Sequence, residues 1–171
     1  MKLAMVLGAA SAMMLTGCSD LISLNPFVPE QDAVVDPTLA GTWKNSDGML
    51  VIVQQEQSAY SITYTENKET AKFNGRLAKM GDAEIMDLVL ESDDAFQVPV
   101  HMMARVWVEG STLRWIFLDS KWLRQQAAEL AGQPSGNRTL LTSPEAAARA
   151  FAWKYAGDAR AYEGDPSVMT R

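Results

Sequence analysis

Residues 98–118 read VPVHMMARVWVEGSTLRWIFL, and this stretch decides the fold. Apolar side chains recur at every second position on both sides of Gly110-Ser111, which is the period of a strand with one buried face. Gly110-Ser111 itself fits a two-residue hairpin turn with glycine at the first central position. The expected register pairs Glu109 with Thr112, Val108 with Leu113, Trp107 with Arg114, Val106 with Trp115, and Ala104 with Phe117. One face of this hairpin is then uninterrupted core.

The opposite face of the hairpin is mixed, because it carries His101, Arg105, Trp107 and Arg114. We expect another element to cover part of it, with Arg114 over the Trp107 ring as a cation–π pair. His101 is the only histidine. A metal site or a catalytic dyad would need partners that the sequence does not offer, so we interpret His101 as structural, in a buried hydrogen bond.

Five further strands are predicted upstream of this hairpin by alternating or continuous apolar runs between turn residues. The seven predicted strands are Leu39–Asn45, Met49–Gln55, Ala59–Thr65, Thr70–Met80, Ala83–Glu91, Val98–Glu109 and Thr112–Leu118. Their connections are too short for a parallel crossover, so neighbours must be antiparallel. The prediction is a mainly β fold, an antiparallel meander of about seven strands in a small barrel or half-barrel.

Two C-terminal helices are predicted to pack against this sheet. The first runs from Lys121 to Leu130 and ends at Gly132. The second starts at Ser143-Pro144-Glu145, with proline at the first position and an acid at the positive end of the helix dipole, and runs to about Ala156. The domain is therefore predicted to span residues 38–157. The polar stretch 158–171, which contains Gly164 and Pro166, is predicted to be a loose tail.

The N-terminus has the pattern of a secretory signal peptide over residues 1–17. A minimal basic start at Met1-Lys2 precedes an apolar run that is too short to span a bilayer permanently. Residues 18–37 contain three prolines and several polar residues, which predicts a semi-rigid tether. Leu21, Ile22, Leu24 and Phe27 within it are apolar enough to dock onto the domain or to lie in the lipid interface.

The quartet Leu15-Thr16-Gly17-Cys18 resembles the lipobox of bacterial lipoproteins. The resemblance implies acylation of Cys18, the only cysteine, followed by cleavage before it. Two or three acyl chains hold a protein stably on a membrane, since each buried methylene contributes about 0.8 kcal/mol. A lipidated Cys18 leaves no thiol for a disulfide or for catalysis. Ser19 after the cysteine matches the sorting pattern for the outer membrane, which implies a periplasm-facing protein.

Charge limits the partners of this chain. Lys and Arg total 15 against 21 Asp and Glu, a net charge of −6. No cluster of positive charge is visible, which disfavours nucleic acid and electrostatic docking onto anionic lipid. The sequence also lacks phosphate loops, nucleophile elbows and zinc-ligand spacing, so we expect no enzyme activity, no metal and no cofactor.

Gly41-Thr42-Trp43 at the start of the first predicted barrel strand resembles the Gly-x-Trp signature of lipocalins and related calycin barrels. The resemblance implies that Trp43 closes one end of a barrel and that an arginine from the last strand packs over it. Arg114 is the predicted arginine, with Arg105 as its competitor. The alternative interpretation is that Trp43 is an ordinary core aromatic at the start of a strand.

The segment from Val98 to Arg105, with Gly110, Leu113 and residues 119–123, also resembles a pattern found in small bacterial proteins without an assigned activity. This resemblance implies a shared domain and carries no function.

Three classes of function are compatible with the sequence, and we favour an interaction or accessory lipoprotein. An interaction or accessory lipoprotein would dock another envelope protein through an exposed apolar patch. A lipocalin-like carrier would hold an apolar small molecule or lipid in a cavity. The residues that would line such a cavity, or else form a solid core, are Trp43, Met102, Val106, Trp115 and Phe117. An enzyme would need a polar cleft around His101 or Arg105.

Overall fold

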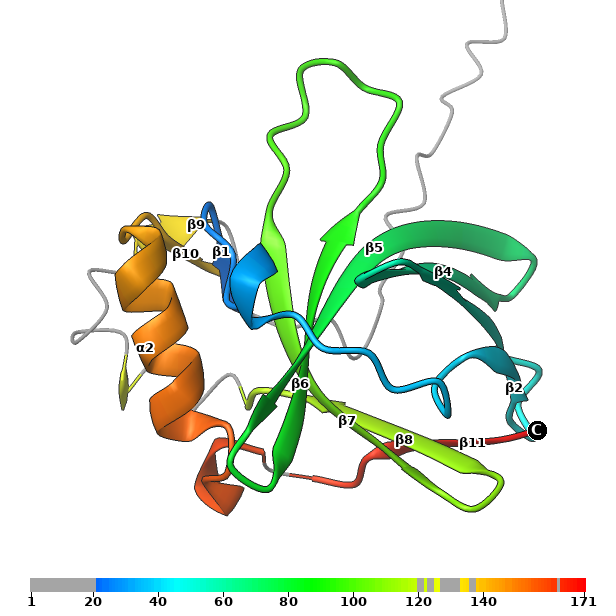
Figure 1. The fold of residues 1–171 in the computed structure, drawn as a ribbon. Coiled ribbons are helices and arrows are strands. Elements are labelled where there is room, and N and C mark those ends of the chain that lie inside the picture. Colours follow the sequence, from blue (N-terminus) through cyan, green and yellow to red (C-terminus); the bar gives the residue numbers. More distant parts are fainter. Residues whose placement is uncertain (1–20, 120–121, 123–124, 127–132, 136–137, 163) are drawn as a thin grey trace, which may run out of the picture.

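The structure, a computed structural model, describes residues 21–119, 122, 125–126, 133–135, 138–162 and 164–171. Its centre is an antiparallel barrel (Figure 1). The barrel strands are β2 (Gly41–Lys44), β3 (Leu50–Glu56), β4 (Ala59–Glu66), β5 (Glu69–Met80), β6 (Ala83–Leu90), β7 (His101–Glu109), β8 (Thr112–Phe117) and β11 (Ser167–Thr170). From β2 to β8 each strand pairs with the next, which confirms the predicted meander.

The β7–β8 hairpin has the predicted register, from Glu109 opposite Thr112 to Ala104 opposite Phe117. Gly110 takes a φ of 60°, a conformation that favours glycine in a two-residue turn. The start of β7 differs from the prediction, because the strand begins at His101 rather than at Val98. Pro99 has no N–H to donate to a sheet, and the residues before His101 instead form a loop that leaves the barrel.

The barrel has eight strands rather than seven, because the C-terminal stretch supplies the last one. Strand β11 pairs with β8 through four residues, from Ser167 opposite Trp115 to Thr170 opposite Thr112. Thr170 also pairs with Lys44 of β2, which closes the ring. The prediction of a loose tail over 158–171 is therefore wrong for this segment. Met169 is buried in the barrel between the exposed residues Val168 and Thr170.

The segment after Asp20 packs into the domain, in contrast to the predicted tether. Strand β1 (Leu21–Ser23) runs parallel to β10 (Arg138–Leu141) and pairs with His101 of β7. Phe27 and Val28 are fully buried. A short 3-10 helix, η1 (Glu30–Asp32), follows, and Asp32 forms an ion pair with Arg149. Prolines allow this extended path, and burial of the apolar side chains stabilises it.

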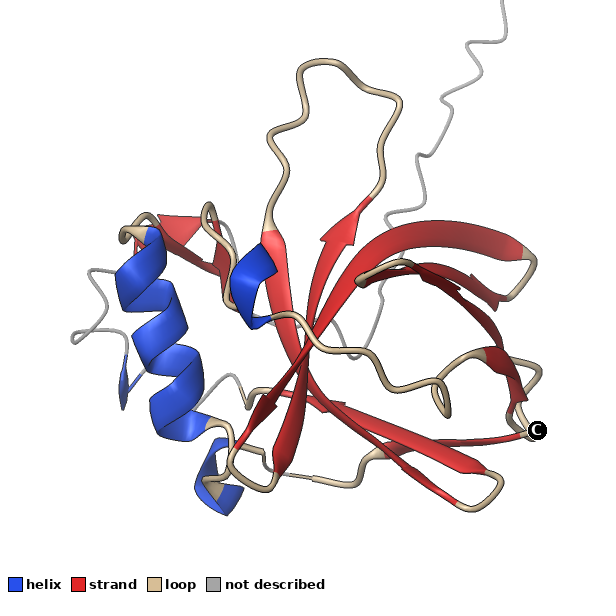
Figure 2. Ribbon diagram, viewed as in Figure 1, coloured by secondary structure: helices blue, strands red, loops and turns tan. Residues whose placement is uncertain are grey.

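One C-terminal helix, α2 (Glu145–Tyr155), is present in the described residues where two were predicted, and it packs beside the barrel (Figure 2). Pro144 is its N-cap residue, without a side-chain cap. Of the other predicted helix, Trp122, Gln125 and Gln126 are helical, and its remaining residues lie outside the described part. The other short elements are β9 (Gln133–Ser135) and the 3-10 helix η3 (Ala159–Ala161).

Two apolar cores result from this arrangement. One fills the barrel around Trp43, Leu77, Met86 and Val106. The other lies outside the barrel and joins β5, β6 and β7 to α2 and to the segment that contains Phe27. Trp122, Phe151 and Tyr155 are in ring contact there, with a distance of 4.7 Å between the Trp122 and Tyr155 centroids.

Candidate functional site

Trp43 closes the barrel at the end where the β7–β8 hairpin lies. Its side chain is fully buried, and the indole Nε1 donates a hydrogen bond to the Leu39 carbonyl at 3.0 Å. The Arg171 guanidinium lies 4.4 Å from the centre of the Trp43 ring. Arg171 also donates to the carbonyls of Ala40, at 3.3 Å, and Thr38. An arginine that follows the last strand thus packs over the tryptophan, as in a calycin-like barrel.

Gly41 has a backbone conformation that favours glycine. Its φ of +152° lies in a region that other residues rarely adopt, whereas a Cβ atom there would only be in ordinary van der Waals contact with the Arg171 Nε, at 3.5 Å. The glycine and the tryptophan of the signature therefore have separate roles, since the glycine supplies this backbone conformation and the tryptophan supplies the ring.

The predicted arginine was the wrong one. Arg114 forms an ion pair with Glu109 at 3.1 Å, and Arg105 lies over Trp107 at 5.5 Å, the place predicted for Arg114. Arg114 and Trp43 lie on different strands, and the guanidinium of Arg114 contacts Glu109 instead. The prediction is wrong because the last strand of the barrel is β11 rather than β8, and Arg171 follows directly after it.

The predicted cavity or core residues face the barrel interior. Trp43 and Val106 are buried in one apolar cluster, and Trp115 and Phe117 are partly buried and pack against it. Met102 is buried too but is not part of this cluster. Other side chains of the chain, including Tyr60, Leu113 and Met169, complete the cluster, which brings four of the five predicted residues together.

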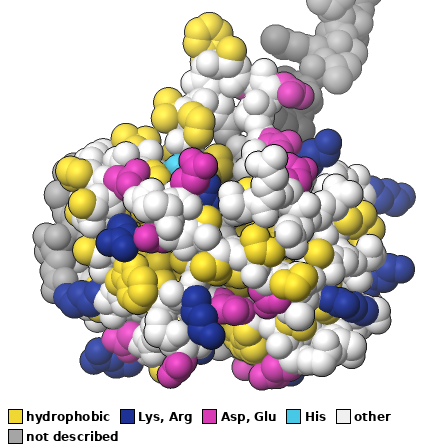
Figure 3. All heavy atoms as spheres, viewed as in Figure 1, with side chains coloured by type: hydrophobic (Ala, Val, Ile, Leu, Met, Phe, Trp, Pro, Cys, Tyr) yellow, Lys and Arg dark blue, Asp and Glu magenta, His cyan; other side chains and the backbone are white. Residues whose placement is uncertain are grey.

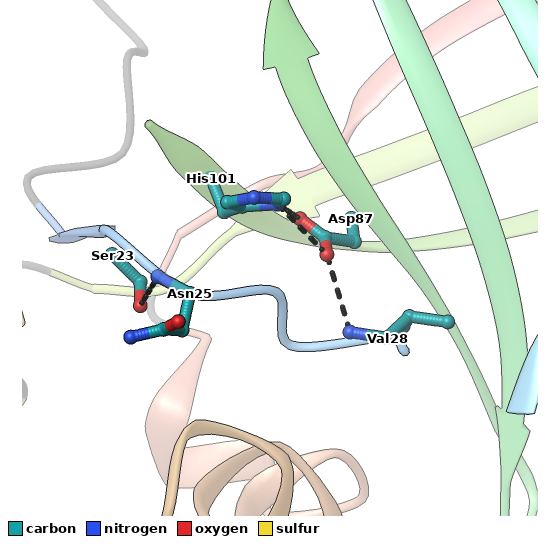
Figure 4. A network of polar contacts seen from close by, with 5 residues as sticks. All are labelled: Ser23, Asn25, Val28, Asp87 and His101. Carbon is teal, nitrogen blue, oxygen red and sulfur yellow. Dashed lines mark hydrogen bonds and ion pairs between the residues drawn. The ribbon is translucent and has the colours of Figure 1, made fainter. Parts of the chain in front are cut away.

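His101 joins the barrel to the N-terminal segment (Figure 4). Its Nδ1 lies 2.9 and 3.1 Å from the two carboxylate oxygens of Asp87, which is almost fully buried. Asp87 also accepts a hydrogen bond from the Val28 backbone N–H at 3.2 Å. A structural His101 was predicted, but its partner Asp87 was missed because nothing in the local pattern sets it apart from other strand acids.

The hydroxyl of Ser23 in the same network accepts from the Asn25 backbone N–H at 3.1 Å, and no bond from Ser23 to His101 is recorded. A serine, a histidine and an aspartate are therefore near one another without the continuous hydrogen-bond chain that activates a nucleophile. This arrangement holds the N-terminal segment in place, and we assign it no chemistry.

Several described groups have a pKa shifted from its usual value, and the acids Glu84 and Tyr162 are two of them. Burial raises the pKa of Glu84 on β6, and repulsion from Asp36 raises it further, while Lys79 opposes both effects. Burial also raises the pKa of Tyr162, whose hydroxyl has no hydrogen-bond partner among the described residues. The Glu84 carboxyl interacts electrostatically with Asp36 and Tyr60, and the Tyr162 hydroxyl with Arg105 and Asp158.

A cavity of about 350 Å³ lies outside the barrel, between α2 and the helical residues before it. Its lining residues are Trp122, Gln125, Gln126, Lys154, Tyr155 and Arg160. Arg160 is paired with Asp158 at 2.7 Å, and the Lys154 Nζ lies over the Tyr155 ring at 4.7 Å. Both cations therefore already have partners within the chain.

Cys18, the predicted lipidation site, lies outside the described residues. No described helix is long and apolar enough to cross a membrane. Within the described ranges, no group of three or more His, Cys, Asp or Glu side chains is arranged to hold a metal ion. Protein-family models, curated proteins and solved structures give no match to this chain.

Proposed function

We propose that this protein is a lipid-anchored lipoprotein of the bacterial envelope that acts as an interaction or accessory module, without a catalytic step. The observation that carries the proposal is the apolar cluster that occupies the barrel interior. Trp43, Val106 and Met169 are buried together in a single apolar cluster. The outer surface is then the part of the domain available for a partner.

The anchor in this proposal is Cys18, in the lipobox formed with Leu15, Thr16 and Gly17. Leu21 is buried in the domain, so only Ser19 and Asp20 separate it from Cys18. Three residue steps span at most about 11 Å. A lipidated domain would therefore lie directly at the membrane surface rather than at the end of a twenty-residue tether. Ser19 favours the outer membrane, with the domain facing the periplasm.

The proposal is tested with the full-length chain and its Cys18→Ser variant, expressed in a diderm bacterium. We expect the wild-type protein to carry the mass of acyl chains on Cys18 and to remain with the outer membrane. Lysine-directed cross-linking in intact cells should then yield one discrete protein adduct. We expect the variant to be released from the membrane and to lose most of that adduct. A variant that stays membrane-bound, or a wild type without an adduct, would refute the proposal.

The second candidate is a carrier of an apolar small molecule or lipid. The observation that favours it is the calycin-like closure by Trp43 and Arg171 at one end of the barrel, with partly exposed Trp115 and Phe117 in its wall. A carrier should be purified from membranes with a stoichiometric ligand. Mass spectrometry of the native protein measures this directly, and a ligand-free mass argues for the accessory module.

A further inference from the structure

The loop between β6 and β7 is the most exposed apolar feature of the described chain. It projects from the barrel, and apolar side chains stand at its tip (Figures 1 and 3). Phe96 is 95% exposed and Val98 is 63% exposed. Leu90, at the end of β6, is also exposed. A phenylalanine with almost its whole surface in water is costly for a monomer, which points to a surface that a partner covers.

Hydrogen bonds within the loop fix how Phe96 is presented. The Asp94 carboxylate accepts from the Phe96 backbone N–H at 2.9 Å, and the Asp94 carbonyl accepts from the Gln97 N–H at 3.0 Å. The Ser92 hydroxyl accepts from the Asp94 N–H at 3.1 Å. Such a turn loses less conformational entropy on binding than an open loop does.

The charges of the loop indicate the partner's chemistry. Glu91, Asp93 and Asp94 lie within five residues of Phe96, and no Lys or Arg occurs between Glu91 and Val100. Within the described chain, no ion pair involves Glu91 or Asp93. The complementary surface is therefore an apolar pocket with a positively charged border.

We propose that this loop is a docking element that inserts Phe96 into an apolar pocket, bordered by Lys or Arg, on a second envelope protein. The inference deepens the proposed function and rests on it, because it names the surface and the partner's chemistry. A lipid bilayer is the poorer occupant. Insertion of Phe96 would bring three carboxylates against the headgroups, and an anionic membrane surface repels them.

The test uses the full-length lipidated chain in host membranes, with the photo-reactive residue p-benzoylphenylalanine in place of Phe96. The matched control carries the same residue in place of Trp153, an aromatic side chain of α2 that is 46% exposed. We expect a single protein adduct from position 96, at least tenfold stronger than from position 153. The cross-linked peptide of the partner should contain apolar residues with Lys or Arg beside them.

Charge reversal makes the test specific. Glu91→Lys with Asp93→Lys leaves Asp94 and its turn intact, and we expect it to reduce the adduct at least fivefold without changing Tm. An adduct insensitive to these changes overturns the proposal. The proposal is also overturned if position 96 gives an adduct to lipid, an adduct to a second copy of this chain, or no adduct at all. If lysine-directed cross-linking of the wild type still yields its partner, only this inference fails; if that adduct is also absent, the proposed function fails with it.

Discussion

At the scale of single residues, the barrel closure depends on two side chains far apart in the sequence. Trp43 supplies the ring and Arg171 the cation, while Gly41 supplies a backbone conformation that other residues rarely adopt. The glycine and the tryptophan could be predicted from a three-residue signature. Arg171 could not be predicted, because it lies five residues after a proline in a polar stretch, and no local sequence pattern indicates that it contacts the barrel.

Arg171→Ala should lower the free energy of unfolding by about 1–2 kcal/mol. The substitution removes a cation–π contact with a buried tryptophan and the hydrogen bonds to two carbonyls. Arg114→Ala is the control and should cost at most about 1 kcal/mol, because its ion pair with Glu109 is partly exposed. Urea denaturation measures both. Equal losses for the two variants would show that Arg171 does not close the barrel.

Glu84→Gln should stabilise the protein at neutral pH. The folded-state pKa of Glu84 is raised by burial, so the folded state binds its proton more tightly than the unfolded state does. Stability is therefore lost as pH rises from the unfolded value of 4.5 through the folded pKa, and glutamine removes that loss. We expect a higher Tm than wild type at pH 7.5 and no difference at pH 3.5. The exposed Glu69→Gln serves as the control; a gain that persists at pH 3.5 would contradict the assignment.

At the scale of elements, the barrel strands were predictable and the two ends of the chain were not. Strands β2 to β8 are joined by short turns, so local alternation and turn residues are enough to place them. Strand β11 pairs with β8 across a gap of 49 residues that contains α2. Its two apolar residues, Val168 and Met169, are adjacent, so the sequence has no alternation that marks a buried face. Strand β1 likewise pairs with β10, more than a hundred residues away.

Met169→Ala should destabilise the protein by about 2–4 kcal/mol, because it creates a cavity in the barrel core. Val168→Ala on the same strand should cost less than about 1 kcal/mol, since Val168 points outward. This alternation is the property of a paired strand. Two variants with the same small effect in thermal unfolding would mean that residues 167–170 are not part of the barrel.

Asp87 holds the segment around β1 and η1. Removal of the Asp87 carboxylate should therefore detach this segment before it affects the barrel strands. Asp87→Ala leaves the buried Val28 N–H without its acceptor, which costs about 2–3 kcal/mol. Hydrogen exchange should show lost protection over residues 21–28 before the barrel strands are affected. Asp87→Asn keeps an acceptor oxygen and should retain most of the protection. Unchanged exchange in Asp87→Ala would exclude this role.

At the scale of the whole molecule, the described residues form an eight-stranded barrel with an apolar core cluster, and helix α2 packs beside it. The sequence was enough to predict the fold class, the core face of the β7–β8 hairpin and the interior position of Trp115 and Phe117. The exposed Phe96 was not predicted, because Val98 and Val100 continue the alternation of β7 in the sequence. Only the three-dimensional structure shows that the strand starts at His101 and that the preceding residues leave the sheet.

The central claim is that the barrel interior is a core rather than a binding cavity. Titration of the full-length protein with N-phenyl-1-naphthylamine, an uncharged apolar fluorophore, tests it most directly. The account predicts no saturable one-to-one binding by the folded protein. Saturation at one probe per chain, abolished by Ala104→Phe in the barrel interior, would contradict the claim and establish a carrier in its place.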